Sequence, residues 1–249
     1  MNSQIRKHFD LSTTTYRSSA VVQKKVADRC CSHIPEKQFF RVLEMGAGGG
    51  LLTDACIRVL KRSSIYVALD LSAMMLKLIS WQNASLIQAD GEVPPFRDNS
   101  FSLLISSSAM QWYRHGTESL LNNLRLLEKG GFFSLAIFVK GTFRQMKHAT
   151  AVSGFGSLYP LLSAREYVQG LNSAGLNPSW SVHEYTEYHA SVQEFLKSHK
   201  QTGATYTSPK AGAGKKAYRA FCREYKDAYS TESGIPASYR VLYLWGSRH

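Results

Sequence analysis

The stretch VLEMGAGGGLLT, residues 42–53, indicates the fold of this chain. It begins with apolar residues typical of a buried strand, passes through a glycine-rich turn, and continues into a segment with helical character. Glycines let the backbone approach a ligand closely, and the first N–H groups of a helix have no partners within that helix. A strand, a glycine turn and a helix in this order are therefore typical of a nucleotide-binding α/β fold.

The spacing of these glycines separates two classes of nucleotide-binding enzyme. Dinucleotide-binding enzymes use the pattern G-x-G-x-x-G, whose third glycine would stand where this chain has Leu51. The pattern present is Gly46-x-Gly48-x-Gly50, preceded by Glu44. This spacing is typical of class I methyltransferases that use S-adenosylmethionine, and it disfavours a nicotinamide-dependent enzyme. A tight turn without a ligand is the alternative interpretation.

Strands and helices alternate along residues 39–139. The apolar patterns predict strands over 39–45, 64–70, 84–90, 101–107 and 132–139, and helices over 51–61, 72–80 and 116–131. Alternation of this kind predicts βαβ units whose parallel sheet is covered by helices on both faces. We therefore expect an α/β fold with a Rossmann-like, doubly wound and mostly parallel sheet of seven strands.

The two ends of the chain are less regular. Helical spacing over 18–34 is stopped by Pro35. Further elements are expected as helices over 163–174, 190–200 and 214–229 and as strands over 178–187 and 239–246. We expect residues 1–249 to form a single domain with three parts. These are an N-terminal helical lid over 1–38, a cofactor-binding core over 39–139, and a C-terminal half over 140–249 with a basic helical insertion at about 190–230.

Two further acids follow strands of the same predicted sheet. Asp70 ends the second strand and Asp90 ends the third. Because the carboxyl ends of parallel strands meet at one edge, these acids and Glu44 are expected to converge on one crevice. Asp70 suits the ribose hydroxyls of a nucleoside, Asp90 the adenine amino group, and Glu44 an ammonium group. Each acid alone is more often a helix cap or a solvated residue, so the prediction depends on all three.

The composition is ordinary for a globular protein, with 44% apolar and 19% charged residues. The longest apolar stretch, 131–139, is too short to span a bilayer, and the N-terminus has no apolar segment typical of a signal peptide. The four cysteines are Cys30, Cys31, Cys56 and Cys222. They form no CxxC pair, so we expect reduced thiols in a cytoplasmic protein. No histidine and cysteine cluster has metal-ligand spacing, and we expect no metal.

The net charge of +12 is unevenly distributed. Residues 44–139 carry eight basic and eight acidic side chains, whereas residues 1–43 carry eight and three and residues 140–249 carry fourteen and seven. All of the excess therefore lies in the two terminal portions. A basic excess indicates an anionic partner that docks on these portions, or it serves solubility alone.

Several motifs together resemble the malonyl-acyl-carrier-protein O-methyltransferases of biotin synthesis. The motifs are HFDLSTTTY (8–16), VLEMGAGGGLLT (42–53), ALDLSAMML (68–76), ADGEVPPF (89–96), SSSAMQWY (106–113), KGTFRQM (140–146), LKSHKQTGAT (196–205) and IPASYRVLYLWG (235–246). AMQWY, GTFRQM and KSHKQTGAT are the most specific, because they lie outside the cofactor fingerprint. The chain departs from the usual family residues at Ala47 and Gly49 in the turn and at Ser106-Ser107, where the family usually has Ser-Asn.

The resemblance implies an S-adenosylmethionine-dependent enzyme that methylates the free carboxylate of malonyl-acyl carrier protein and releases S-adenosylhomocysteine. Esterification removes a negative charge, so that fatty-acid elongation enzymes accept the product as the primer of a pimeloyl chain. The same resemblance implies a set of cofactor-binding residues: Glu44, Gly46, Gly48, Gly50, Asp70, Leu71, Met75, Asp90, Gly91, Ser106 and Ser107. Phe9 is expected to cover the cofactor as part of the lid, with plain packing as the alternative.

The acceptor has its own chemical requirements. A malonyl carboxylate is ionised at neutral pH and needs no general base, but it needs donors that replace water as it is desolvated. Arginine supplies two such donors in a fork, which makes Arg144 the first candidate, with Tyr16, Lys200 and Tyr206 behind it. The alternatives are an exposed arginine, packing tyrosines and a solvated lysine. Trp112 is expected to line the acceptor pocket, with core packing as the alternative.

An acidic acyl carrier protein would suit a basic docking surface. The candidate residues are Lys197, Lys200, Lys215, Lys216, Arg219 and Arg223. Lys215, Arg219 and Arg223 recur every four residues and thus share one helix face. A solvated charged face is the alternative interpretation of each residue.

Two other classes of function remain open from the sequence. One is another class I methyltransferase that acts on RNA or on a small carboxylic acid, since basic charge permits RNA binding. The absence of a separate RNA-binding motif disfavours RNA. The other is a cofactor-binding regulator without catalysis, which the residues at Ala47, Gly49 and Ser107 make conceivable.

Overall fold

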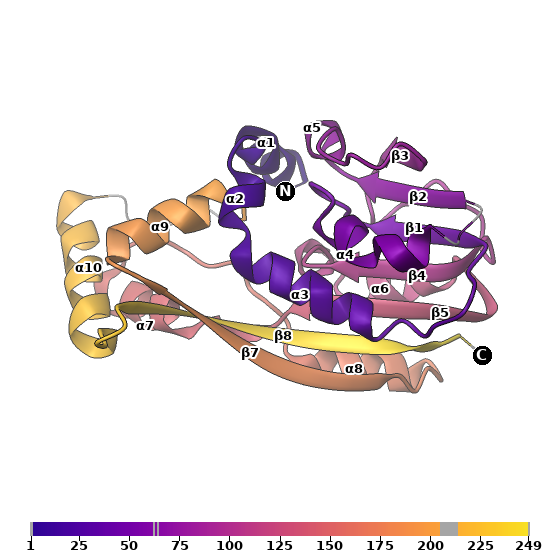
Figure 1. Ribbon diagram of the computed structural model, residues 1–249. Coiled ribbons are helices and arrows are strands. Elements are labelled where there is room, and N and C mark those ends of the chain that lie inside the picture. The colour runs from indigo at the N-terminus through magenta and orange to yellow at the C-terminus, as the bar shows by residue number, and fades with distance from the viewer. Residues whose placement is uncertain (1, 62, 64, 205–213, 249) are drawn as a thin grey trace. The chain divides into compact units, whose positions relative to one another are not determined.

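The computed structural model describes residues 2–61, 63, 65–204 and 214–248. It contains a seven-stranded sheet with the strand order β3-β2-β1-β4-β5-β8-β7 (Figure 1). The strands are β1 (Arg41–Met45), β2 (Ile65–Asp70), β3 (Ala84–Gln88), β4 (Phe101–Ser107), β5 (Leu127–Phe138), β7 (Ser179–His189) and β8 (Ile235–Ser247). The short strand β6 (Lys140–Phe143) lies outside this order. Neighbouring strands from β3 to β5 are parallel and β8 is antiparallel to β5, which confirms the expected mostly parallel sheet.

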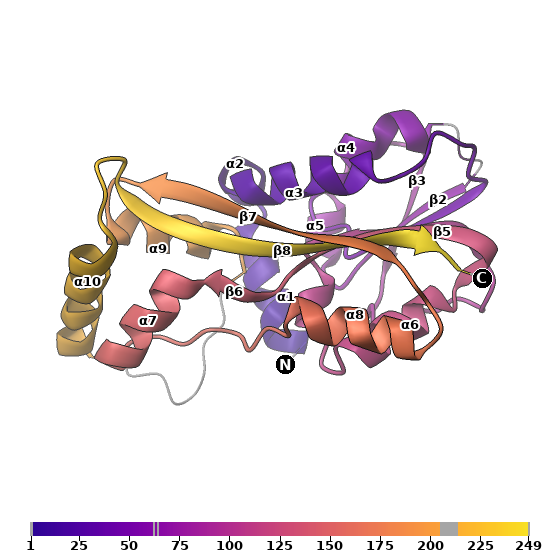
Figure 2. The ribbon, with the colours of Figure 1, turned by 90° about the horizontal axis from the view of Figure 1, so that it is seen from below.

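Helices flank both faces of this sheet. The helices are α1 (Asn2–Ser12), α2 (Tyr16–Ser19), α3 (Val21–Ser32), α4 (Leu51–Leu60), α5 (Ala73–Leu76), α6 (Thr117–Leu124), α7 (Arg144–Ser153), α8 (Ala164–Ser173), α9 (Val192–Gln201) and α10 (Lys215–Tyr229), with a 3₁₀ turn η1 (Met110–Trp112). Figure 2 shows α3 and α4 along one face and α6 and α8 along the other. This is the doubly wound arrangement that alternating strands and helices predict.

The core follows from the apolar runs of the strands. In β4, the residues from Phe101 to Ser106 are all buried, as expected for a strand covered on both faces. Leu43, Leu104 and Leu135 of neighbouring strands form one cluster with Leu171 of α8. Helices α6 and α8 pack closely, because a Cβ at Gly170 would lie 2.3 Å from the Cγ2 atom of Thr117.

Several elements differ from the sequence prediction, and α6 and α7 are two of them. The helix expected over 116–131 ends at Leu124, and Leu127 already pairs with Phe101 at the start of β5. The predicted helix was therefore too long, because Leu127, which precedes Gly130, belongs to β5. The sequence also did not predict α7, which packs on α10.

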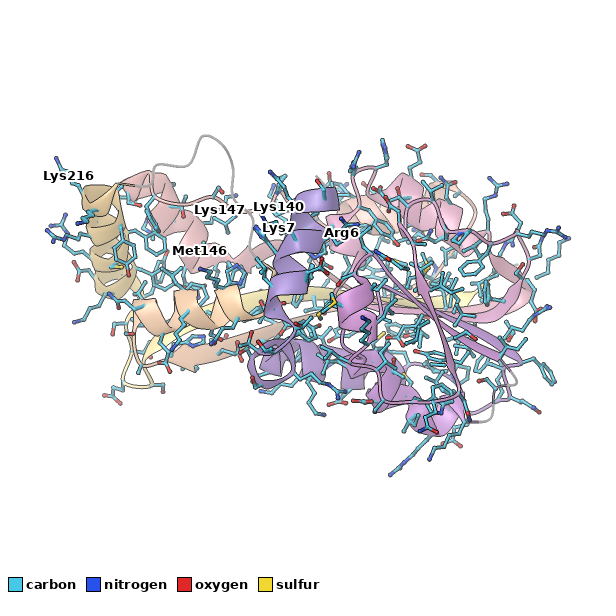
Figure 3. The ribbon with its side chains drawn as sticks, turned by 90° about the horizontal axis from the view of Figure 1, so that it is seen from above. Arg6, Lys7, Lys140, Met146, Lys147 and Lys216 are labelled. Atoms are coloured by element: carbon cyan, nitrogen blue, oxygen red, sulfur yellow. The ribbon has the colours of Figure 1, made fainter. Side chains whose placement is uncertain are left out.

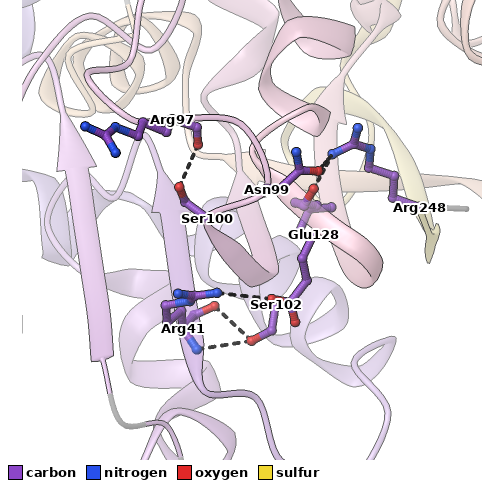
Figure 4. Close-up of polar contacts among 8 residues, drawn as sticks. Arg41, Arg97, Asn99, Ser100, Ser102, Glu128 and Arg248 are labelled. Carbon is purple, nitrogen blue, oxygen red and sulfur yellow. Dashed lines mark hydrogen bonds and ion pairs between the residues drawn. The ribbon is translucent and has the colours of Figure 1, made fainter.

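Polar contacts join β1 and β4 where these two strands begin, at the opposite end of the strands from the glycine turn (Figure 4). The Ser102 hydroxyl donates to the Arg41 carbonyl at 3.0 Å and accepts from the Arg41 N–H at 3.1 Å. The register of β4 and β5 shifts next to this serine, and Arg41 also forms an ion pair with Glu128 at 3.2 Å. The Arg248 guanidinium donates to the Asn99 side chain at 2.8 Å. These contacts fix the strands at the end away from the predicted site.

The chain divides into two compact units. Unit 1 comprises Met1–Val22, Lys140–Leu161 and Glu184–Arg240, and unit 2 comprises Gln23–Val139, Leu162–His183 and Val241–His249. Unit 2 holds the parallel strands β1 to β5, whereas unit 1 holds α1, α2, α7, α9 and α10. That the N-terminal helices act as a lid stays a prediction. Over the described ranges, every helix is too short or too polar to span a membrane.

Candidate functional site

The glycine turn joins β1 to α4 and has the conformation that its glycines permit. Gly46, Gly48 and Gly50 have φ values of +66°, +50° and +83°, and Gly50 is the residue that caps α4. A Cβ at Gly46 would lie 2.2 Å from the Cβ atom of Ala109, so a larger residue does not fit there. Gly49, where the chain departs from the family, is not among the residues with positive φ. The three positions of the turn with positive φ are therefore all occupied by glycine.

Asp70 ties this turn to the next strand end. One carboxylate oxygen accepts from the Gly48 N–H at 2.8 Å, and the other accepts from the Ser72 N–H at 2.8 Å. Ser72 caps α5, as its sequence position predicts, because its hydroxyl accepts from the Met75 N–H at 3.1 Å. The two backbone contacts fix the orientation of the Asp70 carboxylate beside the glycine turn. Leu71 beside Asp70 is half-buried, whereas Met75 is buried.

Gly91, which follows Asp90, lies beside the half-buried Tyr113. A Cβ at Gly91 would lie 2.6 Å from the Tyr113 hydroxyl, which donates to the Asn123 side chain at 2.8 Å. Asn123 in turn donates to the Gly91 carbonyl at 2.8 Å. Burial raises the pKa of Tyr113, and the nearby charges of Glu92, Asp90 and Asp70 raise it further.

Glu44 on β1, Asp70 at the end of β2 and Asp90 beyond β3 thus belong to three neighbouring parallel strands. That the three acids line one crevice stays a prediction. The charge of Asp70 acts on both Tyr113 and Glu44, and that of Asp90 acts on Tyr113. The sequence did not identify Tyr113 and Asn123 as members of this cluster. The signal that could have found Tyr113 is its position in the AMQWY motif.

Glu44 is the most buried of the three acids, with 1% of its surface exposed. Its carboxylate accepts from the Thr53 hydroxyl at 2.7 Å and from the Tyr66 hydroxyl. Burial raises the pKa of Glu44 from its ordinary value of 4.5 to about 7, the two hydroxyl donors lower it, and the charge of Asp70 raises it. A cation bound nearby would favour the charged form of this side chain.

The end of β4 lies beside β1. The Ser106 hydroxyl is buried and donates to the Met45 carbonyl at 2.8 Å, so it already has a role within the sheet. The Ser107 hydroxyl is also buried, and it has no hydrogen-bond partner among the residues that the structure describes. Trp112 follows in η1 and is half-buried.

Within unit 1, the motifs that carry the specific resemblance contact one another. The Thr15 hydroxyl donates to the Gln201 carbonyl at 2.9 Å, and a Cβ at Gly203 would lie 3.0 Å from a ring carbon of Phe9. The segment over 8–16 thus packs against the end of α9. Half-buried Tyr16 follows this segment, and exposed Lys200 lies on α9.

The motif over 140–146 joins the same cluster. The Phe143 ring meets the rings of His199 and Tyr239, each with centroids 4.7 Å apart. The Gln145 amide donates to the Ser238 hydroxyl at 2.7 Å. Burial lowers the pKa of His199 to about 4, so its imidazole is neutral at pH 7. His199 is a half-buried member of this cluster that the sequence did not single out.

Arg144 begins α7 and points its guanidinium to a carboxylate. Its Nη1 atom lies 3.0 Å from an oxygen of Glu184, and both side chains are more than half exposed. Arg144 therefore contacts the Glu184 carboxylate through one guanidinium nitrogen, and its role as a clamp for the acceptor carboxylate stays a prediction. Glu184 was missed because no sequence motif links it to Arg144. Tyr206 lies outside the described residues.

The predicted site residues thus fall into two groups. Among the cofactor candidates, all but Phe9 belong to unit 2, and among the described acceptor candidates, all but Trp112 belong to unit 1.

Exposed basic side chains gather on unit 1. All six of the predicted docking residues are exposed, and they lie on α9 and α10 (Lys197, Lys200, Lys215, Lys216, Arg219 and Arg223). Figure 3 shows further cations on the face that bears Lys216, namely Arg6, Lys7, Lys140 and Lys147. Unit 1 contains fifteen basic and seven acidic residues, whereas unit 2 contains fifteen and eleven. Most of the positive charge excess therefore belongs to unit 1.

Comparisons with known proteins match a domain within unit 2 and also match almost the whole chain, unit 1 included. Residues 43–135 match the family described as a methyltransferase domain. The malonyl-[acyl-carrier protein] O-methyltransferase of Geobacter sulfurreducens is 30% identical, with 98% of each chain covered. The protein of the same name from Halalkalibacterium halodurans is 28% identical, with 96% of each chain covered. A methyltransferase-like structure from Bacillus halodurans C-125 superimposes with a TM-score of 0.65 at 14% identity, covering 90% of this chain and 99% of that one.

Proposed function

Because the chain belongs to the malonyl-[acyl-carrier protein] O-methyltransferase family, we propose that it methylates the free carboxylate of malonyl-acyl carrier protein with S-adenosylmethionine. The observation that carries this proposal is the extent of the similarity. It covers 98% of the chain and so includes unit 1, well beyond the methyltransferase domain over 43–135. The product, a methyl ester, is the primer for the pimeloyl chain of biotin.

The residues of unit 2 fit the proposed cofactor. Each carboxylate oxygen of Asp70 accepts from a backbone N–H, which orients this carboxylate at the glycine turn, and we propose that it also accepts from the two ribose hydroxyls. Asp90 would accept from the adenine amino group, and Glu44 would face the ammonium group. The first N–H groups of α4 and the glycine backbone of Gly46, Gly48 and Gly50 complete the set. When bound, S-adenosylmethionine supplies an electrophilic methyl group, and S-adenosylhomocysteine is released.

The acceptor carboxylate is proposed to bind at Arg144. The carboxylate is already ionised, so the protein has to hold and desolvate it, and positioning can lower the barrier by roughly 7–11 kcal/mol. Arg144 now contacts Glu184, and a substrate carboxylate would take the place of that side chain. An exposed ion pair of this type contributes only about 0–1 kcal/mol, so the exchange costs little. Tyr16, Lys200 and Tyr206 are proposed to assist, and Trp112 to line the pocket.

The carrier protein is proposed to dock on the basic face of unit 1. Carrier proteins of this type are acidic, and exposed lysines on α9 and α10 complement that charge. RNA is the alternative anionic partner, and a small carboxylic acid is the alternative acceptor. A cytoplasmic location, where the carrier protein is made, is part of the same proposal.

Mass spectrometry of the intact carrier protein tests the proposal. The purified chain is incubated with S-adenosylmethionine and malonyl-acyl carrier protein, with unloaded and acetyl-loaded carrier protein as controls. We expect a gain of one methylene mass on the malonyl form alone. Cofactor binding without any methyl gain would indicate a regulator, and salt-sensitive RNA binding without turnover would indicate the RNA alternative.

A further inference from the structure

Three side-chain oxygens from neighbouring elements of unit 2 lie in contact with one another. They are Oε2 of Glu44 on β1, Oγ1 of Thr53 on α4 and the hydroxyl oxygen of Tyr66 on β2. The Thr53 hydroxyl lies 2.7 Å from Oε2 and 2.8 Å from the Tyr66 hydroxyl, which itself contacts Oε2. The three oxygens therefore form a closed triangle, which we call the oxygen triad.

The oxygen triad is shielded from water. Glu44, Thr53 and Tyr66 are each at most 2% exposed, and the Tyr66 ring packs on that of Trp81 with centroids 4.7 Å apart. A buried carboxylate is costly unless donors replace its water, and here both hydroxyls contact the same oxygen, Oε2. Oε1 takes neither of these two contacts, so the triad fixes the carboxylate through one oxygen only.

The number of protons in the oxygen triad depends on the state of Glu44. Each hydroxyl carries one proton, and the triad has three oxygen–oxygen contacts. With Glu44 ionised, two protons serve three contacts, and one pair of oxygens meets without a proton. With Glu44 protonated, three protons serve three contacts. The buried triad therefore has a place for a third proton.

The surroundings of Glu44 act in the same direction. Burial raises the pKa of Glu44 to about 7, the two hydroxyl donors lower it, and the negative charges of Asp70 and Asp54 raise it. The other titratable groups that interact with Glu44 are Tyr66 on β2, Cys56 on α4 and Cys30 on α3. A positive charge that arrives beside Glu44 would oppose these effects and favour the ionised carboxylate.

We propose that Thr53 and Tyr66 are positioning residues that hold Glu44 for a cationic ligand, and that Glu44 releases its proton when the ligand's ammonium group binds. The inference rests on the proposed function, which supplies that ligand. The proton leaves to the solvent, and both hydroxyls then donate to Oε2, so the buried charge stays hydrogen-bonded. Binding of the cation and deprotonation of Glu44 are thus coupled.

Calorimetric titration with S-adenosylhomocysteine, which carries the ammonium group, tests this coupling in the full chain. Repeating the titration in two buffers of different ionisation enthalpy counts the protons released per bound ligand. At about pH 6.5, below the pKa of Glu44, we expect the parent chain to release about half a proton or more. Glu44→Gln has no carboxyl proton at this position and should release none.

Tyr66→Phe tests the positioning role, because it removes one donor and keeps the ring that packs on Trp81. The hydrogen bond from Tyr66 lowers the pKa of Glu44, so its loss should raise that pKa. At about pH 7 the variant should bind about three- to tenfold more weakly and release more protons than the parent chain. Thr53→Val should act in the same direction, whereas Thr53→Ser, which keeps the hydroxyl, should restore the parent proton count.

The matched control is Tyr225→Phe in unit 1. It removes a buried tyrosine hydroxyl that donates to the Pro236 carbonyl at 2.8 Å, and it should keep the affinity and proton count of the parent chain.

The outcomes separate this inference from the proposed function. Tight binding without proton release in the parent chain would overturn the inference, while a methyl gain on the carrier protein would still support the proposed function. Weaker binding by Tyr66→Phe with an unchanged proton count would show a merely structural role and also overturn it. If the parent chain does not bind the ligand at all, the cofactor assignment fails and this inference fails with it.

Discussion

The candidate site of unit 2 is acidic, whereas that of unit 1 is basic. In unit 2, the acids Glu44, Asp70 and Asp90 lie near one another at strand ends, held by backbone and hydroxyl donors. In unit 1, exposed cations dominate, and Arg144 is paired with a single carboxylate. The proposed methyl donor carries positive sulfonium and ammonium groups, and the proposed acceptor carries a carboxylate. The comparison supports the proposal that each of the two sites carries the charge opposite to that of its proposed ligand.

The two sites also differ in how firmly they are built. The turn of unit 2 depends on positive φ values and on a contact that admits no Cβ, so its shape is fixed by the backbone. The Arg144 site of unit 1 depends on an exposed side chain whose present partner can be replaced. Changes in unit 2 should therefore have larger effects than changes in unit 1.

The largest effect is expected from Gly46→Ala. Its Cβ would lie 2.2 Å from the Cβ atom of Ala109, and its φ of +66° is unfavourable for alanine. We expect a loss of about 1–3 kcal/mol from the backbone alone and a further loss as the turn shifts. Urea unfolding measures the loss of stability, and calorimetry with S-adenosylhomocysteine measures the effect of the shifted turn on ligand affinity. The control is Gly154→Ala in unit 1, with a φ of +70° and nothing within 4 Å, and equal losses in both variants would contradict the packing argument.

The next effect is a dependence of the free energy of unfolding on pH, which has opposite signs for one group in each unit. Glu44 in unit 2 has its pKa raised from 4.5 to about 7, so the folded chain keeps a proton that the unfolded chain releases. The free energy of unfolding should therefore fall as the pH rises from 4.5 to 7, by up to about 3 kcal/mol for this group. His199 in unit 1 has its pKa lowered from 6.5 to about 4, so the unfolded chain takes the proton first. Its contribution should be lost as the pH falls from 6.5 to 4.

Urea unfolding at a series of pH values separates these two contributions. Glu44→Gln should remove the decline toward neutral pH, and His199→Gln should remove part of the decline toward acid. Profiles that change in the same direction for both variants would contradict the assigned pKa shifts.

A smaller effect is expected from the docking face. Lys216→Glu with Arg219→Glu reverses two exposed charges on one side of α10. The KM for malonyl-acyl carrier protein should rise about tenfold at low salt, and high salt should reduce the difference. Lys61→Glu with Lys129→Glu, which reverses two exposed charges in unit 2, is the matched control. An equal rise in that control would show that net charge, not a docking face, is responsible.

Much of unit 2 could be predicted from the sequence because its signals are local. The glycines stand at positions with positive φ, Asp70 ends β2, and Asp90 lies two residues beyond β3. The limits of α6 and β5 were wrong because the leucines before Gly130 fit either element, and only pairing with Phe101 decides. Tyr113 and Asn123 belong to the site through contacts with Gly91 that no local pattern contains.

Unit 1 was less predictable because it is assembled from distant segments. The motifs over 8–16, 140–146 and 196–205 carried the family resemblance, but their mutual packing depends on long-range contacts such as that between Thr15 and Gln201. The ion pair of Arg144 with Glu184 likewise joins residues of separate segments. The resemblance identified which segments matter, and only the structure relates them.

The division of roles between the units is tested most directly by calorimetric titration of S-adenosylhomocysteine into Asp70→Ala and Arg144→Ala, with turnover on malonyl-acyl carrier protein measured on the same samples. Asp70→Ala should weaken the affinity by at least about tenfold, because a charged acceptor for hydroxyl donors is lost. Arg144→Ala should bind as tightly as the parent chain while its kcat/KM falls about 10- to 100-fold. Unchanged affinity in Asp70→Ala, or an equal loss of affinity in Arg144→Ala, would contradict the account.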